Sequence, residues 1–429
     1  MDAFRSLENC HDLRQQGTNL LGAITEYTLR GNMGQAQEVS LQSRILNLTG
    51  NIRNLVAQPQ DQWLWHIVQS NEMAAIKLFV HWHVFEHIPI GQSVSYAQLS
   101  DQVSVDLSLL TSMLCKSVVD LSVRVSRMLI STGVLGEAGP DRVAHTAKSK
   151  NFLPGNPYGD LDRVVMEYGL SGCDMIRYFE SNGRNEPDGL SPSPFTFTKG
   201  MQGNDMWDVY NDQSKKEEFM RAMTALDRLA PIIGVYDFSW IAEASAKANN
   251  DRVLLVDVGG GSGHAVQAIC GSIGLPLERC VLQDKEPVIS RVEEVGNLPG
   301  LKLMSIDMHK EQPVQGALVY YIRHCLHDYN DHIARGILQH ISKAMAADST
   351  LLIAEHVVEW PPKPESTAMD MLMLAVGGKE RTAMEWAHLL RSGGLTLERI
   401  HQNPTSSHCI IQCSKATIVI GQDQLAIEA

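Results

Sequence analysis

The feature that most constrains the fold of this chain is an apolar segment that runs directly into a glycine-rich turn. Residues 254–264 read LLVDVGGGSGH, and an apolar helix pattern follows them. Glycines let the backbone approach a ligand closely, and a helix start presents N–H groups that have no intrahelical partner. The segment therefore predicts a nucleotide-binding turn between a strand and a helix.

The spacing of the glycines limits the kind of nucleotide. Gly259, Gly261 and Gly263 form GxGxG, whereas the dinucleotide fingerprint is GxGxxG, and His264 stands at its third small position. No Gly-Lys-Ser/Thr follows, which excludes a P-loop. The pattern DxGxGxG resembles the S-adenosylmethionine (SAM) loop of class I methyltransferases. A glycine-rich turn in another α/β domain is the alternative.

The composition limits the partners of the chain. Its formal net charge is −13, which argues against binding to nucleic acid or to an anionic membrane surface. No apolar run approaches about 18 residues, so no transmembrane helix is expected. Residues 1–10 lack the apolar segment of a signal peptide. We therefore expect a cytoplasmic protein with eight reduced, scattered cysteines and no metal site.

The pattern along the chain predicts an organisation in four segments. These are a helical, winged-helix domain over 1–150, a helical linker and substrate cap over 151–250, a catalytic domain over 251–415 and a tail over 416–429. In the first two segments, helices are expected over 71–87, over 96–102 after a Ser95 cap, and from Phe219 to about Val235. A hairpin is expected over 133–145.

The winged-helix pattern allows two interpretations, DNA binding through its third helix or a dimerisation module. The third helix carries few basic residues against its acids: Lys116, Arg124 and Arg127 against Asp106 and Asp120. This is a poor footprint for DNA, so dimerisation is favoured. Residues 115–125 interrupt this helix, either as a genuine extension or as translated intron sequence.

From residue 254 onward, strands alternate with helices. Strands are expected near residues 253–258, 279–283, 301–305, 317–322 and 350–354. A helix over 383–392 and a strand pair over 395–401 and 408–414 close the pattern. A terminal antiparallel hairpin on a parallel sheet is typical of methyltransferases and distinguishes this α/β pattern from a dinucleotide fold.

Polar residues follow the expected strands, where open α/β sheets bind their ligands. Asp284 is placed to accept the two ribose hydroxyls of a nucleoside, although a helix N-cap is an alternative role. The Asp307 carboxylate would accept the adenine amino group, and the Met308 thioether would pack on the ring. Arg323 is placed to hold the SAM carboxylate or the adenine edge.

His327 is the candidate general base. It comes just after a central strand, and a neutral imidazole titrates near working pH, so it would accept the proton of a phenol with a pKa of about 10. Glu355 follows the next strand, and Glu380 lies in GGKERT. A carboxylate bonded to one ring nitrogen would orient the other toward substrate. Taken singly, each of these residues would be an ordinary structural or surface side chain.

The motifs that follow the glycine loop share one order along the chain: LVDVGGGSGH, QDKEPVI, SIDMHK, RHCLHDYND, IAEHV and GGKERT. Together they resemble the plant and fungal O-methyltransferases of the caffeate/flavonoid type, in which a winged-helix N-terminal domain is a dimerisation module. The resemblance implies a class I SAM-methyltransferase fold, a Rossmann-like α/β sheet with a terminal antiparallel hairpin beside a mainly helical domain. It also implies SAM as the cofactor and a homodimer.

The resemblance assigns roles to individual residues. It implies a base at His327 flanked by Glu355 and Glu380, and SAM contacts at Gly259, Gly260, Gly261, Asp284, Asp307, Met308 and Arg323. It implies substrate contacts at Phe219, Met223 and Met373, although core packing is an alternative for Met373. Arg323 replaces the usual Lys of plant members, and Tyr329 replaces their Trp. These departures favour the fungal secondary-metabolite branch.

The sequence therefore predicts a SAM-dependent O-methyltransferase that acts on a phenolic or enolic hydroxyl of a small aromatic or polyketide-type metabolite. Methyl transfer would rest on the proximity of nucleophile and methyl group and on the base. Two alternatives stay open. One is a non-methylating enzyme of the same fold, such as a pericyclase or hydroxylase, and the other is a winged-helix regulator.

Overall fold

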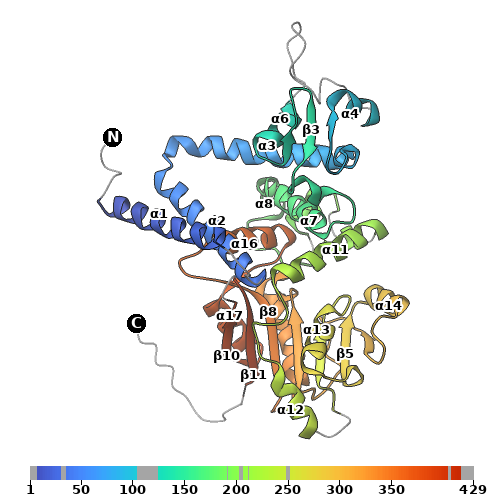
Figure 1. Ribbon diagram of the computed structural model, residues 1–429. Helices are drawn as coiled ribbons and strands as arrows, with labels where there is room; N and C mark the ends of the chain where they lie inside the picture. Colours follow the sequence, from blue (N-terminus) through green and yellow to red (C-terminus); the bar gives the residue numbers. More distant parts are fainter. Residues whose placement is uncertain are drawn as a thin grey trace. The chain divides into compact units, whose positions relative to one another are not determined.

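The computed structural model describes residues 7–29, 35–103, 124–190, 192–201, 206–210, 212–247, 252–403 and 407–416. The chain forms two compact units, Met1–Leu153 and Pro154–Ala429 (Figure 1). The predicted limits of the cap at 250 and of the catalytic domain at 415 stay predictions. The predicted tail, 416–429, lies almost entirely outside the described residues.

The first unit is mainly helical and carries a small antiparallel sheet. Its α-helices are α1 (Leu7–Thr28), α2 (Gln35–Val56), α3 (Gln62–His81), α4 (Tyr96–Val103) and α6 (Arg124–Ser131). Its strands are β1 (Ser93–Ser95), β2 (Leu135–Glu137) and β3 (Arg142–His145), in the order β1-β3-β2. The hairpin predicted over 133–145 is confirmed by the pairing of β2 with β3.

The helix predicted over 71–87 is wrong at both ends. It begins at Gln62, and it ends at His81 because His83 adopts a left-handed conformation with φ 55°, which no α-helix continues. A short 3-10 helix, Val84–His87, follows. The predicted Ser95 cap is confirmed, since its hydroxyl accepts the Gln98 N–H at 3.3 Å.

The predicted third helix and the 115–125 segment fall largely outside the described residues. Lys116, Asp106 and Asp120 lie in the undescribed part. Helix α6, which begins at Arg124, falls within the range predicted for the third helix. The winged-helix assignment and the origin of the insert therefore stay predictions.

The second unit is built on an eight-stranded mixed sheet, ordered β10-β11-β8-β7-β4-β5-β6, with β9 paired to β8 (Figure 1). The parallel strands are β4 (Leu255–Val258), β5 (Cys280–Asp284), β6 (Lys302–Ser305), β7 (Val319–Arg323), β8 (Thr350–Val358) and β9 (Arg381–Thr382). The antiparallel pair is β10 (Leu395–Gln402) and β11 (His408–Lys415). All five predicted parallel strands and the closing pair are confirmed, and so is the α/β fold class.

Both faces of the sheet are buried, as its apolar strands require. Successive residues of β4 enter opposite cores: Val256 packs with helices α15 (Asp331–Ala344) and α17 (Ala383–Ser392). Leu255 packs with α12 (Ser239–Lys247), α13 (His264–Ile273) and α14 (Glu286–Val295). This alternation follows the two-residue period of a strand and holds the carboxyl edge of the sheet between two helical layers.

A group of helices contributes a further apolar cluster of this unit. These helices are α7 (Pro157–Gly172), α9 (Pro194–Thr198), α10 (Met206–Val209), α11 (Gln213–Leu229) and α16 (Pro364–Val376). Helix α8 (Met175–Asn182) follows α7 in the chain. The predicted helix from Phe219 to Val235 is wrong in its limits. Asp212 caps α11 through the N–H groups of Ser214 and Lys215, and Pro231 keeps the preceding residue out of the helical conformation.

Candidate active site

The glycine loop joins β4 to α13 with three left-handed residues. Gly259, Gly261 and Gly263 have φ values of 68°, 57° and 81°, which side chains of other residues rarely adopt. At Gly260 the constraint is space, since a Cβ there would lie 2.5 Å from the Asp257 carboxylate. Each of these four positions therefore requires glycine, and the lack of side chains there leaves the loop backbone open to a ligand.

Asp284 lies at the end of β5 and faces this loop. Its Oδ2 accepts the Gly261 N–H at 2.8 Å, and its Oδ1 accepts the Lys285 N–H at 2.7 Å. Burial raises the pKa of this carboxyl because ionisation is disfavoured away from water. The carboxylate is therefore fixed beside the glycine loop, where the sequence places a ribose.

Asp307 follows β6 in a more open setting. Its Oδ1 accepts the His309 N–H at 3.1 Å, and its Oδ2 lies 2.9 Å from Lys310 Nζ. The contact with Lys310 lowers the pKa of Asp307. A cavity of about 460 Å³ is lined by Asp307 together with Lys285 and Leu190, so the ends of β5 and β6 border an open space.

Two sulfur-bearing side chains close the base of the loop. A Cβ added to Gly259 would lie 3.2 Å from Met308 Cε and 2.7 Å from Cys325 Sγ. Met308 was predicted from the sequence, whereas Cys325 was not. The position of Cys325 two residues before the candidate base was the signal available for it.

The predicted SAM contact Arg323 is buried and faces another group in the structure. Its Nη2 donates to the main-chain oxygen of Ala230 at 2.5 Å, just after the end of α11. The guanidinium thus ties the end of α11 to the end of β7, and its predicted contact with the cofactor stays a prediction.

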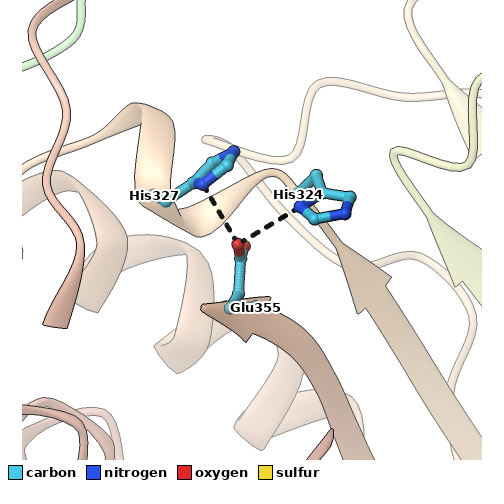
Figure 2. A group of neighbouring side chains, drawn as sticks. All are labelled: His324, His327 and Glu355. Carbon is cyan, nitrogen blue, oxygen red and sulfur yellow. Dashed lines mark ion pairs between the residues drawn. The ribbon is translucent and has the colours of Figure 1, made fainter. Parts of the chain in front are cut away.

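The candidate base is held by two glutamates from separate segments. Nδ1 of His327 lies 2.9 Å from Glu380 Oε1 and 3.3 Å from Glu355 Oε2; Figure 2 shows the His327–Glu355 pair. On the other side of the ring, Nε2 lies 3.7 Å from Asp328 Oδ1. The structure brings the three predicted catalytic residues together and adds Asp328, which the sequence analysis did not single out.

The backbone around these side chains is tightly connected. Glu355 Oε1 accepts the N–H groups of Cys325 and Leu326, both at 3.0 Å. The N–H of Lys379 donates to the main-chain oxygen of His327 at 2.7 Å, and a Cβ on Gly378 would lie 1.9 Å from that same oxygen. Glu355 and the segment GGKERT therefore position the turn that carries His327.

Charge and burial oppose each other at His327. Burial lowers the pKa of its imidazole, but the charges of Glu355 and Glu380 outweigh burial and raise the pKa to about 10. Burial raises the pKa of Asp328 to about 7. The two glutamates therefore favour the protonated form of the imidazole, whose positive charge balances part of the surrounding negative charge.

The predicted substrate residues share one apolar cluster. Phe219, Met223 and Met373 pack with residues of α7, α9 and α10, and the Phe219 ring lies 4.7 Å from that of Tyr210. Met220 was missed, although its Cε lies 3.9 Å from the position of a Cβ on Gly261. This face of α11 thus approaches the glycine loop.

The family model of the O-methyltransferase domain matches residues 181–396. Methyltransferase cfoD of Aspergillus candidus is 30% identical over 93% of this chain and 97% of its own length. The chain belongs to the O-methyltransferase domain family. Methyltransferase pvhD of Talaromyces variabilis is 33% identical over 81% of the chain and 94% of its own length. The predicted resemblance to fungal members is confirmed.

Two solved structures share the fold of this family member. The crystal structure of OxaC in complex with SAH and oxaline superposes with a TM-score of 0.78 at 22% identity, over 95% of this chain and 100% of that chain. The structure of the LepI complex with SAM superposes with a TM-score of 0.72 at 18% identity, over 95% and 100%. Both support the class I SAM-methyltransferase fold.

Proposed function

We propose that this chain transfers the methyl group of SAM to a phenolic or enolic hydroxyl of a small aromatic or polyketide-type metabolite, with His327 as the general base. The observation that carries this proposal is the imidazole of His327, whose Nδ1 faces Glu380 at 2.9 Å and Glu355 at 3.3 Å. The Cys325 thiol, two residues before His327, donates to the main-chain oxygen of Gly259 in the glycine loop at 3.6 Å. This contact connects the candidate base to the loop.

The residues present fit SAM. Its candidate contacts are the glycine loop and the ends of the next strands: Gly259, Gly260, Gly261, Asp284, Asp307, Met308 and Arg323. The open backbone of the loop suits a nucleoside, and the ionised form of Asp284 suits two hydroxyl donors. When bound, SAM supplies an electrophilic methyl group. Family membership and these contacts together support it as the cofactor.

The proton of the acceptor is the part of the reaction that this chain manages. Nδ1 of His327 is directed to Glu380, and Nε2 lies 3.7 Å from Asp328 Oδ1, so Nε2 is the ring nitrogen that would face the acceptor hydroxyl. A phenol has a pKa of about 10, and the pKa of His327 is raised to about 10. Transfer of the proton between them is therefore nearly balanced in free energy. Because the glutamates favour the protonated imidazole, productive binding of a phenol should release a proton.

The apolar cluster of Phe219, Met223 and Met373 supports an aromatic acceptor. Buried aromatic and thioether groups bind flat apolar rings, and Met373 is 7% exposed. These side chains would orient the acceptor, whereas the base would act on its hydroxyl.

We also propose a homodimer formed through the first unit. Four large apolar side chains at the start of α3 are exposed, Trp63, Leu64, Trp65 and Ile67, at 61%, 51%, 44% and 49%. Such a patch marks an interaction surface. Sedimentation should show a dimer that Trp63→Glu weakens. A cytoplasmic location stays a prediction. Among the described helices, none is long and apolar enough to cross a membrane.

The test is to incubate the purified chain with labelled SAM and a panel of phenolic and polyketide metabolites, and to weigh the products. A mass increase of one methyl group, lost in His327→Ala, is expected. Turnover without that increase would instead support a non-methylating enzyme such as a pericyclase. DNA retained in a low-salt gel shift would revive the regulator alternative.

A further inference from the structure

A second imidazole, that of His324, faces Glu355 beside the candidate base. Nδ1 of His324 lies 3.9 Å from Oε2 of Glu355, and Nδ1 of His327 lies 3.3 Å from that same oxygen, as Figure 2 shows. Within the described part of the chain, these three residues form a group whose ligand-type atoms all lie within 4.8 Å of one another.

Two members of this group hold buried polar atoms without hydrogen-bond partners. Among the described residues, neither nitrogen of His324 has a partner, and neither does Oε2 of Glu355. The Glu355 side chain is fully buried, and that of His324 is 12% exposed. A buried polar group without a partner costs about 1–3 kcal/mol. Two of these atoms, Nδ1 of His324 and Oε2 of Glu355, lie 3.9 Å apart, and two such atoms at one place indicate a ligand that the protein would bind there.

The backbone holds the His324 ring in this position. His324 has a φ of 49°, a left-handed value that is uncommon outside glycine, and its N–H donates to the main-chain oxygen of Ala354 at 3.2 Å. The imidazole is therefore held with its Nδ1 toward Glu355 before any ligand binds, and imidazole nitrogens are common metal ligands.

The donor set matches one class of ion. Two imidazole nitrogens and one carboxylate oxygen form the ligand set of open zinc sites, whose bonds of roughly 2.0–2.2 Å place ligand atoms roughly 3.4 Å apart. The separations of 3.3 Å and 3.9 Å are near that value. The site also has an excess of negative charge, since Glu380 and Asp328 are buried beside the imidazole of His327.

We propose that His324, His327 and Glu355 form a binding site for Zn²⁺ and that its occupancy blocks methyl transfer. The ion replaces the proton on Nδ1 of His327, and that proton leaves to solvent. The remaining ring proton then resides on Nε2, so the imidazole has no lone pair left for the acceptor hydroxyl. Binding of the ion is independent of the reaction proposed above, whereas the inhibition rests on it.

The binding test uses Co²⁺ as a spectroscopic probe of the full-length chain. Titration should produce visible absorption of a low-coordinate nitrogen and oxygen site, saturating at one ion per chain, and Zn²⁺ should abolish it. Mg²⁺ should not, because it prefers an oxygen-rich octahedral shell. Absence of this absorption, or its persistence in excess Zn²⁺, would overturn the proposal.

The decisive variant is His324→Asn, because asparagine tolerates the left-handed conformation. Loss of a supporting group around a metal costs about 10–100-fold in affinity, so loss of a direct ligand should weaken Zn²⁺ binding by at least that factor. His332→Asn removes an exposed imidazole on α15 and is the matched control. Equal weakening in both variants, or in neither, would place the ion elsewhere. Circular dichroism checks that each variant folds.

The activity measurement follows once an acceptor is known. Zn²⁺ should inhibit the wild-type chain over the range in which it displaces Co²⁺, and His324→Asn should retain turnover while resisting Zn²⁺. Inhibition that is equal in both would contradict the blocking role. If no acceptor is methylated, the proposed function fails, but the Co²⁺ titration still decides whether the site exists.

Discussion

At the ends of β4 and β5, the chain presents backbone N–H groups and bare glycines, whereas at the ends of β7 and β8 it presents buried charged side chains. In the first region, both oxygens of Asp284 accept neighbouring N–H groups. In the second, His327 is enclosed by acids, and Oε2 of Glu355 has no hydrogen-bond partner among the described residues. The carboxyl edge of the sheet thus offers backbone groups at β4 and β5 and buried ionic side chains at β7 and β8.

This difference teaches which property each region controls. A loop shaped by glycine φ values and close approach serves binding, so substitutions there should change affinity and stability. A buried ionic cluster serves proton transfer, so substitutions there should change rate while binding persists. The predictions below test that separation.

The largest effect is expected for His327→Gln. Removal of a general base costs about 10²–10⁴-fold in turnover, because glutamine cannot accept the proton, while SAM affinity should stay near the wild-type value. Initial rates and calorimetric SAM binding check both parts. His332→Gln, an exposed site on α15, is the control. Equal losses of rate and SAM affinity would contradict the separation of the two regions.

Gly260→Ala should cause the next largest effect. Its Cβ would lie 2.4 Å from Leu282 Cδ1 and 2.5 Å from Asp257, and such overpacking costs about 1–3 kcal/mol of unfolding free energy. Gly271→Ala is the matched control in α13, where nothing lies within 4 Å of the new Cβ. It should raise stability by about 0.5–1 kcal/mol. Denaturant unfolding measures both, and equal signs would be inconsistent with this geometry.

Asp284→Asn should weaken SAM binding by about 10-fold, because hydrogen bonds to a charged group contribute about 1.5–3 kcal/mol and neutral ones about half as much. Burial raises the pKa of Asp284. The wild-type carboxylate therefore takes up a proton at higher pH than usual, and SAM affinity should fall from neutral to mildly acidic pH. Calorimetry across that range should show a flatter dependence in Asp284→Asn.

The smallest effect is expected for Asp307→Asn. Its side chain is 44% exposed, and interactions of such solvated carboxylates contribute roughly 1 kcal/mol or less. Lys310 lowers the pKa of Asp307, so this carboxylate should stay ionised further into the acid range than Asp284. A SAM affinity loss in Asp307→Asn larger than that in Asp284→Asn would reverse the assigned order.

Much of the sheet could be predicted because its signals are local. Apolar runs followed by glycine or polar residues marked the strands β4 to β8, and residues 395–414 marked the closing pair. Helix limits were harder. The α11 helix begins six residues before Phe219 because Asp212 caps it, and the end of α3 depends on the left-handed His83. Neither conformation follows from apolar periodicity.

Among side chains that lie far apart in sequence, some could likewise be predicted and others could not. His327 and Glu355 were candidates because they follow successive strands, Glu380 was a second candidate carboxylate, and the family resemblance implied the same three residues. Nothing in the sequence pattern indicated that His324 would face Glu355, or that Met220 would approach Gly261 more closely than its helix neighbours. Those contacts depend on how β7 pairs with β8 and on how α11 turns about its axis.

The sequence alone determined the glycine loop, the positions of the strands along the chain and the carboxylates that follow them, because each depends on the conformational preferences of adjacent residues. Only the tertiary structure decided that His324, His327, Glu355 and Glu380 meet in one buried cluster. Their charges and pKa values arise from parallel pairing of β7 with β8 and from exclusion of water, and both are properties of the assembled sheet.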